Sequence, residues 1–317
     1  MNAQLTTDES AVYDRQLRVW GLEVQQRLNS AKILIIGGNG IAAEVSKNLT
    51  LAGAGLVAIA DDTPCGQDKP GNFLISDDSP ATSTVAEACA CTLQAMNPLI
   101  KVKVEAGPHS DTGLKDLELE QYDTVVATDM NFLQIQDLEA RCIRLKKQLF
   151  ACLLRGAFGV TFVNLNSHSY REKAADGQSF ESKTLIYSNL EGAMSCPVAK
   201  LNKRTHPLYL VSRAVYHFEL LNKRSATSMD LPSLQEIAAK LFKSDEVPPN
   251  AMYCKANLDL LEAWASHEGV LAPVAAILGG VVANHVIRAV SFEGPPIKNM
   301  FYFSLFDNLG VVEDMHV

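Results

Sequence analysis

The 317-residue sequence lacks the cysteine patterns that would indicate a zinc-bound or disulfide-linked protein. Its seven cysteines form no C-x-x-C pair, and the nearest two, Cys89 and Cys91, have the wrong spacing for a usual zinc site. An odd number of cysteines without a secretory signal predicts reduced thiols in the nucleus or cytosol. We therefore expect no metal site and a protein that is not secreted.

Long apolar runs and a positive net charge are also missing. The longest apolar stretch, residues 269–283, is shorter than the roughly 20 residues that a membrane span needs, and it contains Pro273, Gly279 and Gly280. The formal net charge is −8 at pH 7, so the sequence shows no general basic surface for nucleic acid or for an anionic membrane. We expect residues 269–283 to form a core helix, and neither nucleic acid nor membrane as a partner.

Residues 32–62 have the pattern of a β-α-β unit. An apolar run at 33–36 predicts a buried parallel strand, Ile41, Val45 and Leu49 predict one face of a helix, and 56–60 predicts a second strand. The unit has about the length of one nucleotide-binding half of a doubly wound fold.

The turn inside this unit lacks two glycines of the dinucleotide-binding fingerprint. In G-x-G-x-x-G the second glycine lets the backbone approach phosphate, and the third allows the helix to pack closely on the strand. Asn39 and Ala42 occupy those two positions here. The degenerate loop consists of Gly37, Gly38, Asn39 and Gly40. We predict the fold of a nucleotide site with a compromised phosphate cradle.

Two acidic residues are weak candidates for nucleotide contacts. Asp61 ends the second strand, where dinucleotide folds place a carboxylate on a ribose hydroxyl. Asp129 follows another buried strand at 124–128. Between Pro70 and Ile100 there is no Lys or Arg, although a bound triphosphate needs nearby cations. We therefore expect this chain to bind no cofactor tightly.

The remaining pattern predicts an α/β protein with a doubly wound, mostly parallel sheet. We expect a Rossmann-like core at 1–165, a connection and a smaller helical insertion at 166–265, and a helix and strand at 266–317 that complete the fold. Residues 166–196 are polar without helical periodicity and are predicted to be a long connection, and the aromatic run at 301–306 predicts a final strand.

The amino-terminal segment predicts a helix from Ser10, with Arg15 and Arg18 on the side opposite its apolar stripe. The stripe consists of Tyr13, Leu17, Trp20 and Val24. Two interpretations of the arginines stay open. Either they form a solvated surface, or one of them reaches an anionic ligand in another chain, since arginine is always charged and can donate twice to phosphate.

Three segments resemble the activating enzymes for ubiquitin-like modifiers, which have a ThiF/MoeB-type adenylation fold. Residues 13–21 (YDRQLRVWG) resemble the opening signature of these enzymes, and residues 70–74 resemble the corresponding segment of their non-catalytic half. Residues 271–280 are similar to the helix near the end of the adenylation domain. Residues 159–165 and the short length look most like the small subunits that serve the modifier SUMO.

The resemblance implies the regulatory half of a heterodimer. In this family ATP and the modifier's carboxyl terminus form an acyl-adenylate in the large, catalytic subunit. A cysteine of that subunit then takes the modifier as a thioester and passes it to a conjugating enzyme. ATP and magnesium are thus expected at the partner's site, and Arg15 matches the arginine that the small subunit lends in trans. A nuclear location, with the cytoplasm as a second one, is also implied.

Departures from the catalytic halves imply that this chain is inactive alone. Gly71 stands where catalytic halves carry an arginine, the lysine of their next helix has no counterpart, and their C-x-x-C zinc pairs are missing. Cys152 and Cys196 are expected to be small buried hydrophobic residues. Asp129 alone matches a magnesium-binding aspartate of the catalytic halves, and we interpret it as a remnant or a helix cap.

Two other functions stay open on the sequence. One is a Rossmann-type oxidoreductase that uses NAD or NADP, against which the degenerate turn argues. The other is a purely structural scaffold subunit in which Arg15 has no role in catalysis.

Overall fold

A computed structural model describes residues 5–66, 71–76, 78–105, 114, 117–174, 179–197, 201, 205–242, 253–267 and 269–316. For residues 242 and 253–258 it describes the backbone alone.

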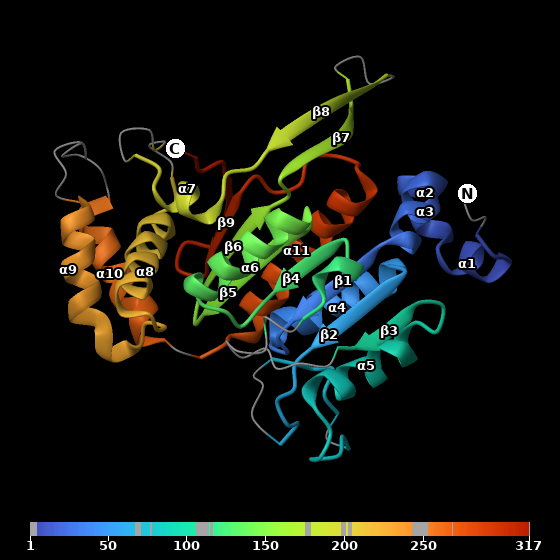
Figure 1. The fold of residues 1–317 in the computed structure, drawn as a ribbon, viewed down its shortest axis with the longest axis horizontal. Helices are drawn as coiled ribbons and strands as arrows, with labels where there is room; N and C mark the ends of the chain where they lie inside the picture. The colour runs from blue at the N-terminus through green and yellow to red at the C-terminus, as the bar shows by residue number, and fades with distance from the viewer. Residues whose placement is uncertain are drawn as a thin grey trace.

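Within these residues a twisted eight-stranded sheet runs through the middle of the molecule (Figure 1), in the order β10-β9-β6-β5-β4-β1-β2-β3. The strands from β5 to β3 in this order are parallel, and β6, β9 and β10 are antiparallel. The predicted doubly wound, mostly parallel sheet is confirmed. The strand bounds are β1 Lys32–Ile36, β2 Leu56–Ala60, β3 Lys101–Val104, β4 Thr124–Ala127, β5 Gln148–Arg155, β6 Phe158–Asn164, β9 Met300–Ser304 and β10 Leu309–Glu313.

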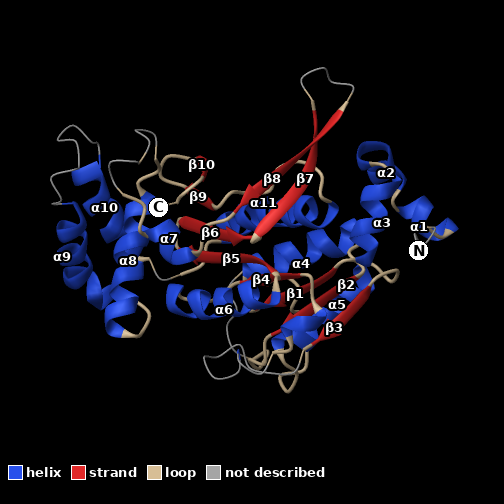
Figure 2. Cartoon of the chain, turned by 45° about the horizontal axis from the view of Figure 1, so that its top comes forward, coloured by secondary structure: helices blue, strands red, loops and turns tan. Residues whose placement is uncertain are grey.

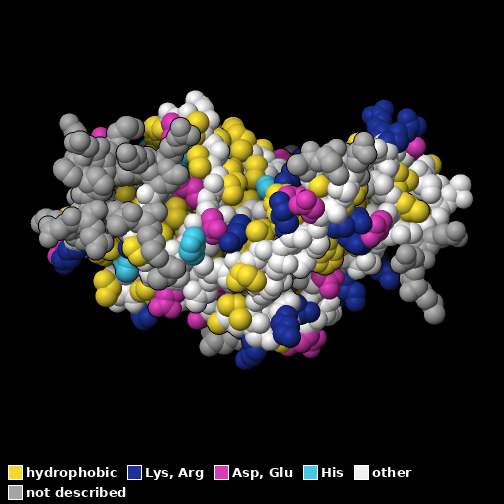
Figure 3. Space-filling model, turned by 90° about the horizontal axis from the view of Figure 1, so that it is seen from above, with side chains coloured by type: hydrophobic (Ala, Val, Ile, Leu, Met, Phe, Trp, Pro, Cys, Tyr) yellow, Lys and Arg dark blue, Asp and Glu magenta, His cyan; other side chains and the backbone are white. Residues whose placement is uncertain are grey.

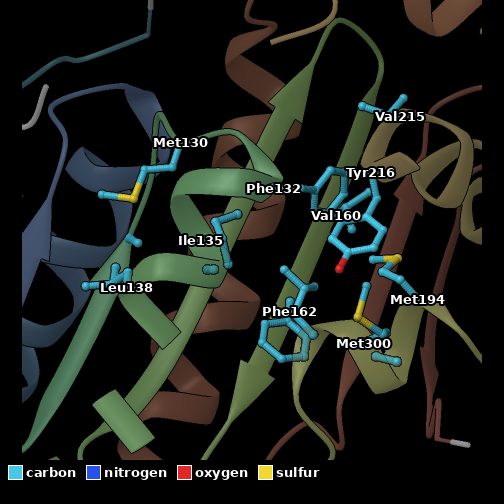
Figure 4. Close-up of a cluster of buried hydrophobic side chains, with 14 of the residues drawn as sticks. Met130, Phe132, Ile135, Leu138, Val160, Phe162, Met194, Val215, Tyr216 and Met300 are labelled. Atoms are coloured by element: carbon cyan, nitrogen blue, oxygen red, sulfur yellow. The ribbon is translucent and has the colours of Figure 1, made fainter. Parts of the chain in front are cut away.

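Helices cover both faces of the sheet, because its central strands are apolar on both sides. Along β1, Ile33 and Ile35 pack with helices α4 (Gly40–Ala52) and α11 (Ala272–Ser291). The alternate residues Leu34 and Ile36 pack into the opposite core, with α6 (Phe132–Leu145) and α8 (Leu208–Asn222). In that core Phe132 of α6 meets Tyr216 of α8 edge-on, with their ring centroids 6.1 Å apart (Figure 4).

The two ends of the molecule are helical (Figure 1). At one end α8 packs with α9 (Leu231–Phe242) and α10 (Tyr253–Ser266), in the part of the chain where the sequence predicts a helical insertion. At the other end lie α1 (Thr7–Val12), α2 (Asp14–Trp20) and α3 (Leu22–Ser30). Thr84 caps α5 (Val85–Met96), which lies over β2 and β3.

The expectation of a long polar connection at 166–196 is wrong. Strands β7 (Ser167–Lys173) and β8 (Phe180–Ile186) form a hairpin that projects from the body (Figure 2), and α7 (Leu190–Met194) follows. The pattern is hard to recognise because β8 is exposed along most of its length and therefore shows no alternation. Arg171 of β7 pairs with Glu293 and, at 3.1 Å, with Glu23 of α3.

Two predicted elements differ from the structure in extent. The single helix expected from Ser10 is divided into α1, α2 and α3, because Tyr13 lies between the first two and Gly21 has a positive φ of 83°. The aromatic strand at 300–304 is followed by another strand, β10.

Helix α11 has the length and composition of a membrane span, but it is a core helix of the sheet. Its apolar face, including Val274, Leu278, Val282 and Val286, is buried on α4 and the sheet. Pro273 lies in its first turn, where proline is tolerated.

Candidate functional site

The turn after β1 is closed by its own asparagine. Asn39 is the N-cap of α4, and its Oδ1 accepts hydrogen bonds from the backbone N–H groups of Ile41 (3.0 Å) and Ala42 (3.1 Å). The first N–H groups of a helix are the donors that a phosphate uses in a nucleotide site. Two of them are therefore already occupied, by a side chain that is 5% exposed.

The segment around Asn72 lies across the same turn. Asn72 Nδ2 donates to the Gly38 carbonyl at 2.8 Å, and a Cβ placed on Gly40 would stand 3.0 Å from the Gly71 carbonyl oxygen. On the other side, a Cβ on Gly38 would stand 2.2 Å from Val85 at the start of α5. Gly38 and Gly40 therefore allow other parts of the protein to pack directly against the backbone of this turn.

The two acidic candidates have different surroundings. Asp61 is 1% exposed, accepts a hydrogen bond from the Thr63 N–H at 2.9 Å, and lies next to Gly38. Asp129 is exposed and has a positive φ of 63°. The cap of the following helix is Asn131, so the interpretation of Asp129 as a helix cap is wrong.

A cavity of about 210 Å³ joins Asn39 and Asp129 at the carboxyl edge of the sheet. Small-molecule sites usually have roughly 300–1,000 Å³. Arg155 lines this cavity, but its guanidinium donates to the carbonyls of Trp264 (2.9 Å) and Ala226 (2.9 Å), and it lies over the Trp264 ring at 4.2 Å. Arg155 thus connects β5 to α10 and the loop after α8.

With these contacts in place, the turn does not fit a nucleoside triphosphate. Asn39 takes the N–H groups of the helix start, Gly71 and Asn72 cover the turn, and the described residues between 71 and 100 bring no cation to it. No group of three or more His, Cys, Asp or Glu side chains among the described residues could hold a metal ion.

Two of the buried cysteines, Cys142 and Cys152, have no nucleophilic character. Burial raises the pKa of Cys142 and of Cys152 to about 12, so both are neutral thiols at physiological pH. Cys152 and Cys196 are buried, as predicted. The side chain of Cys254 lies outside the described residues.

Arg15 stands at the opposite end of α4 from the turn. It is exposed on α2, a helix with no buried residue, and its side chain has no ion pair or hydrogen bond with any described residue. Arg18, one turn later, pairs with Asp14 at 2.9 Å. Basic side chains stand out at the end of the molecule where α1–α3 lie (Figure 3).

The arm formed by α1 and α2 attaches to the last turn of α4. The Tyr13 ring packs on Gly53, which follows that turn, whereas Asn39 caps the first turn. A helix of 13 residues is about 20 Å long. Arg15 therefore lies too far from the turn of its own chain to reach an anion there.

The sequence was compared with known protein families and with individual proteins. The ThiF family matches residues 13–317. The chain belongs to the ThiF family. It is 35% identical over 320 residues to SUMO-activating enzyme subunit 1A of Arabidopsis thaliana, with 98% of this chain and 97% of that protein covered. It is 34% identical to subunit 1B-1 of the same plant, with 98% of both covered.

The fold is shared with E. coli MccB, solved in complex with MccA-N7isoASN. The TM-score is 0.61 over 99% of this chain and 73% of MccB. The sequences are 15% identical, so this likeness concerns the fold alone. The ThiF/MoeB-type adenylation fold expected from the sequence is thereby confirmed.

Sequence reasoning missed two contacts of the site. Asn72 lies in one of the segments that carry the family resemblance, but its bond to Gly38 spans 34 residues and has no local signal. Asn97, which holds Tyr13 of the arm, lies 84 residues away in sequence. Both depend on how α5 and its preceding loop fold over α4.

Proposed function

We propose that this chain is the regulatory small subunit of a heterodimeric SUMO-activating enzyme and that it lends Arg15 in trans to ATP bound by the catalytic subunit. The proposal is supported by relatives named as subunit 1 of that enzyme, which match this chain over nearly its whole length.

The observation that carries the role of Arg15 is its position. The guanidinium is exposed, has no partner among the described residues, and is separated by the length of α4 from the turn of its own chain. On the same arm Val12 and Val19 are 61% and 76% exposed. A charged side chain among exposed apolar ones is typical of a surface that another chain covers.

In the proposed reaction a carboxylate oxygen at the modifier's C-terminus attacks the α-phosphorus of ATP. The bond from that phosphorus to the bridging oxygen of pyrophosphate breaks, and an acyl-adenylate forms. Pyrophosphate leaves with additional negative charge, which a positioned guanidinium stabilises. ATP and magnesium stay with the catalytic subunit, and this chain alone has no adenylating activity.

ATP–pyrophosphate exchange in the presence of SUMO tests the proposal. This chain alone and the catalytic subunit alone are expected to show no exchange, whereas the mixture exchanges. Arg15→Ala is expected to leave the heterodimer assembled and to lower the exchange rate by about 10²-fold or more, as for other electrostatic stabilisers. Arg18→Ala is the matched control, because it removes an arginine from the same helix that is paired with Asp14.

Two outcomes would contradict the proposal. Exchange by this chain alone would mean that its own turn binds ATP despite Asn39 and Asn72. Equal rates for Arg15→Ala and the unmodified heterodimer would instead favour the scaffold interpretation.

A further inference from the structure

The helix that carries Arg15 has few contacts that could fix its position. None of the seven residues of α2 is buried, and the helix ends at Gly21, whose φ of 83° separates it from α3. Its direction is set at its two ends, by Trp20, which packs partly buried against the core, and by Tyr13, the residue between α1 and α2, which is 1% exposed.

Tyr13 is held by a residue from a distant part of the chain. Its hydroxyl accepts a hydrogen bond from Asn97 Nδ2 at 3.0 Å, and the same nitrogen donates to the Thr50 carbonyl at 2.8 Å. Asn97 is itself fixed, because its Oδ1 accepts from the Leu99 N–H at 3.1 Å. The Tyr13 ring lies so close to Gly53 that a Cβ there would stand 2.6 Å from the ring.

The end of α4 explains why the arm attaches at this place. The last carbonyl groups of a helix have no partner within the helix. The Thr50 carbonyl accepts a hydrogen bond from Asn97. Two further carbonyl groups at this end of α4 accept hydrogen bonds from side chains of the arm and of α3. Gln16 Nε2 donates to the Leu51 carbonyl at 3.4 Å, and Gln25 Nε2 donates to the Ala52 carbonyl at 3.0 Å.

We infer that Tyr13, held by Asn97 at the carboxyl end of α4, is a positioning residue that fixes where the Arg15 guanidinium stands in the heterodimer. This inference rests on the proposed role of Arg15. Tyr13 touches neither ATP nor the modifier and acts on the rate only through Arg15. Since Arg15 follows Tyr13 by two residues, a tilt of α2 about this point displaces the guanidinium directly.

Tyr13→Phe in the assembled heterodimer tests the inference, because it removes one hydroxyl and keeps the ring beside Gly53. Asn97 keeps its bond to Thr50. We expect full assembly, an unchanged KM for ATP, and a kcat of pyrophosphate exchange that is about 3- to 10-fold lower, the size expected for losing one hydrogen bond. Tyr209→Phe is the matched control, since it removes a buried hydroxyl that donates to the Ala193 carbonyl at 2.9 Å, in the helical part at the other end.

The decisive measurement repeats Tyr13→Phe in the Arg15→Ala background. If Tyr13 acts through Arg15, the second substitution adds no further loss of kcat, because coupled residues are not additive. An equal loss in both backgrounds, or an equal loss with Tyr209→Phe, would overturn the inference and leave Tyr13 a merely structural residue.

Different results would contradict the positioning role of Tyr13 and the proposed role of Arg15. A slow Arg15→Ala enzyme with a fully active Tyr13→Phe enzyme overturns the positioning role alone. A fully active Arg15→Ala enzyme overturns the proposed function and the positioning role together.

Discussion

At the scale of single residues, Asn39 decides what the first turn of the sheet can bind. An amide oxygen at the N-cap satisfies two backbone donors that would otherwise be available to a ligand. The sequence shows that asparagine replaces a glycine of the fingerprint. It does not show that this side chain folds back onto Ile41 and Ala42, since that depends on the conformation of Asn39, with φ −81° and ψ −177°.

Removal of the cap is expected to destabilise the chain without restoring a nucleotide site. Asn39→Ala should lower the free energy of unfolding by about 1 kcal/mol, as measured by urea denaturation. No ATP binding should appear in calorimetry, because Gly71 and Asn72 still cover the turn. Asn39→Ser, which keeps a capping oxygen, should retain most of the stability. Calorimetric binding of ATP to Asn39→Ala would show that the asparagine alone blocks the site.

At the scale of elements, the approach of α11 to α4 depends on one of two adjacent glycines. A Cβ on Gly279 would stand 2.4 Å from the Cβ of Glu44 and 3.3 Å from the Ile41 carbonyl oxygen, whereas a Cβ on Gly280 would meet nothing within 4 Å. The sequence predicts the core helix, but it cannot distinguish these two glycines, because α4 and α11 are more than 200 residues apart.

The two alanine substitutions are expected to have different effects on stability. Gly279→Ala should lower the free energy of unfolding by roughly 1–3 kcal/mol, since overpacking forces the helices apart. Gly280→Ala should leave it unchanged or raise it by about 0.5–1 kcal/mol, because alanine is the better helix former. Thermal unfolding of both variants measures the difference. Equal melting temperatures would mean that α11 does not pack on α4 as closely as described.

The hairpin β7–β8 shows where prediction at this scale fails. Periodicity identifies elements that bury one face, such as α4, α6 and the central strands. Strand β7 buries only His168 and Tyr170, whereas β8 buries no residue and carries charged or polar residues on both sides. The two strands are held by pairing with each other and by Arg171, and neither leaves a signal in local sequence.

At the scale of the whole molecule, stability depends on pH through buried carboxyl groups. Glu219 of α8 is 3% exposed and accepts a hydrogen bond from the Phe132 N–H at the start of α6, at 2.7 Å. Burial raises its pKa from 4.5 to about 7, although hydrogen bonds from backbone N–H groups oppose the shift. Its contribution to stability is thus fully present below about pH 4.5 and is lost as the pH rises through 7.

Glu219→Gln is expected to flatten this pH dependence. When the pH is raised from 5 to 8, urea denaturation should show that the free energy of unfolding of Glu219→Gln changes more favourably than that of the unmodified chain, by roughly 1–3 kcal/mol. Glu313, whose pKa burial also raises to about 7, contributes a loss of the same sign in both chains, whereas His168 and His285, whose pKa burial lowers to about 4, contribute a gain over this pH range. Glu181→Gln on the exposed strand β8 is the control and should leave the profile unchanged. Parallel profiles for Glu219→Gln and the unmodified chain would contradict the assignment.

The order in which the sheet is assembled has a consequence for synthesis of the protein. Strand β6 has β9 as its outer neighbour, and Phe158 pairs with Ser304, so this edge stays open until the ribosome has made almost 150 further residues. Until then Val160 and Phe162, which are buried in the finished core, lie at the open edge of the growing sheet. Pairings that are so distant in sequence form late and leave apolar surface exposed for longer. The nascent chain is therefore expected to need chaperone protection chiefly between the completion of β6 and the emergence of β9.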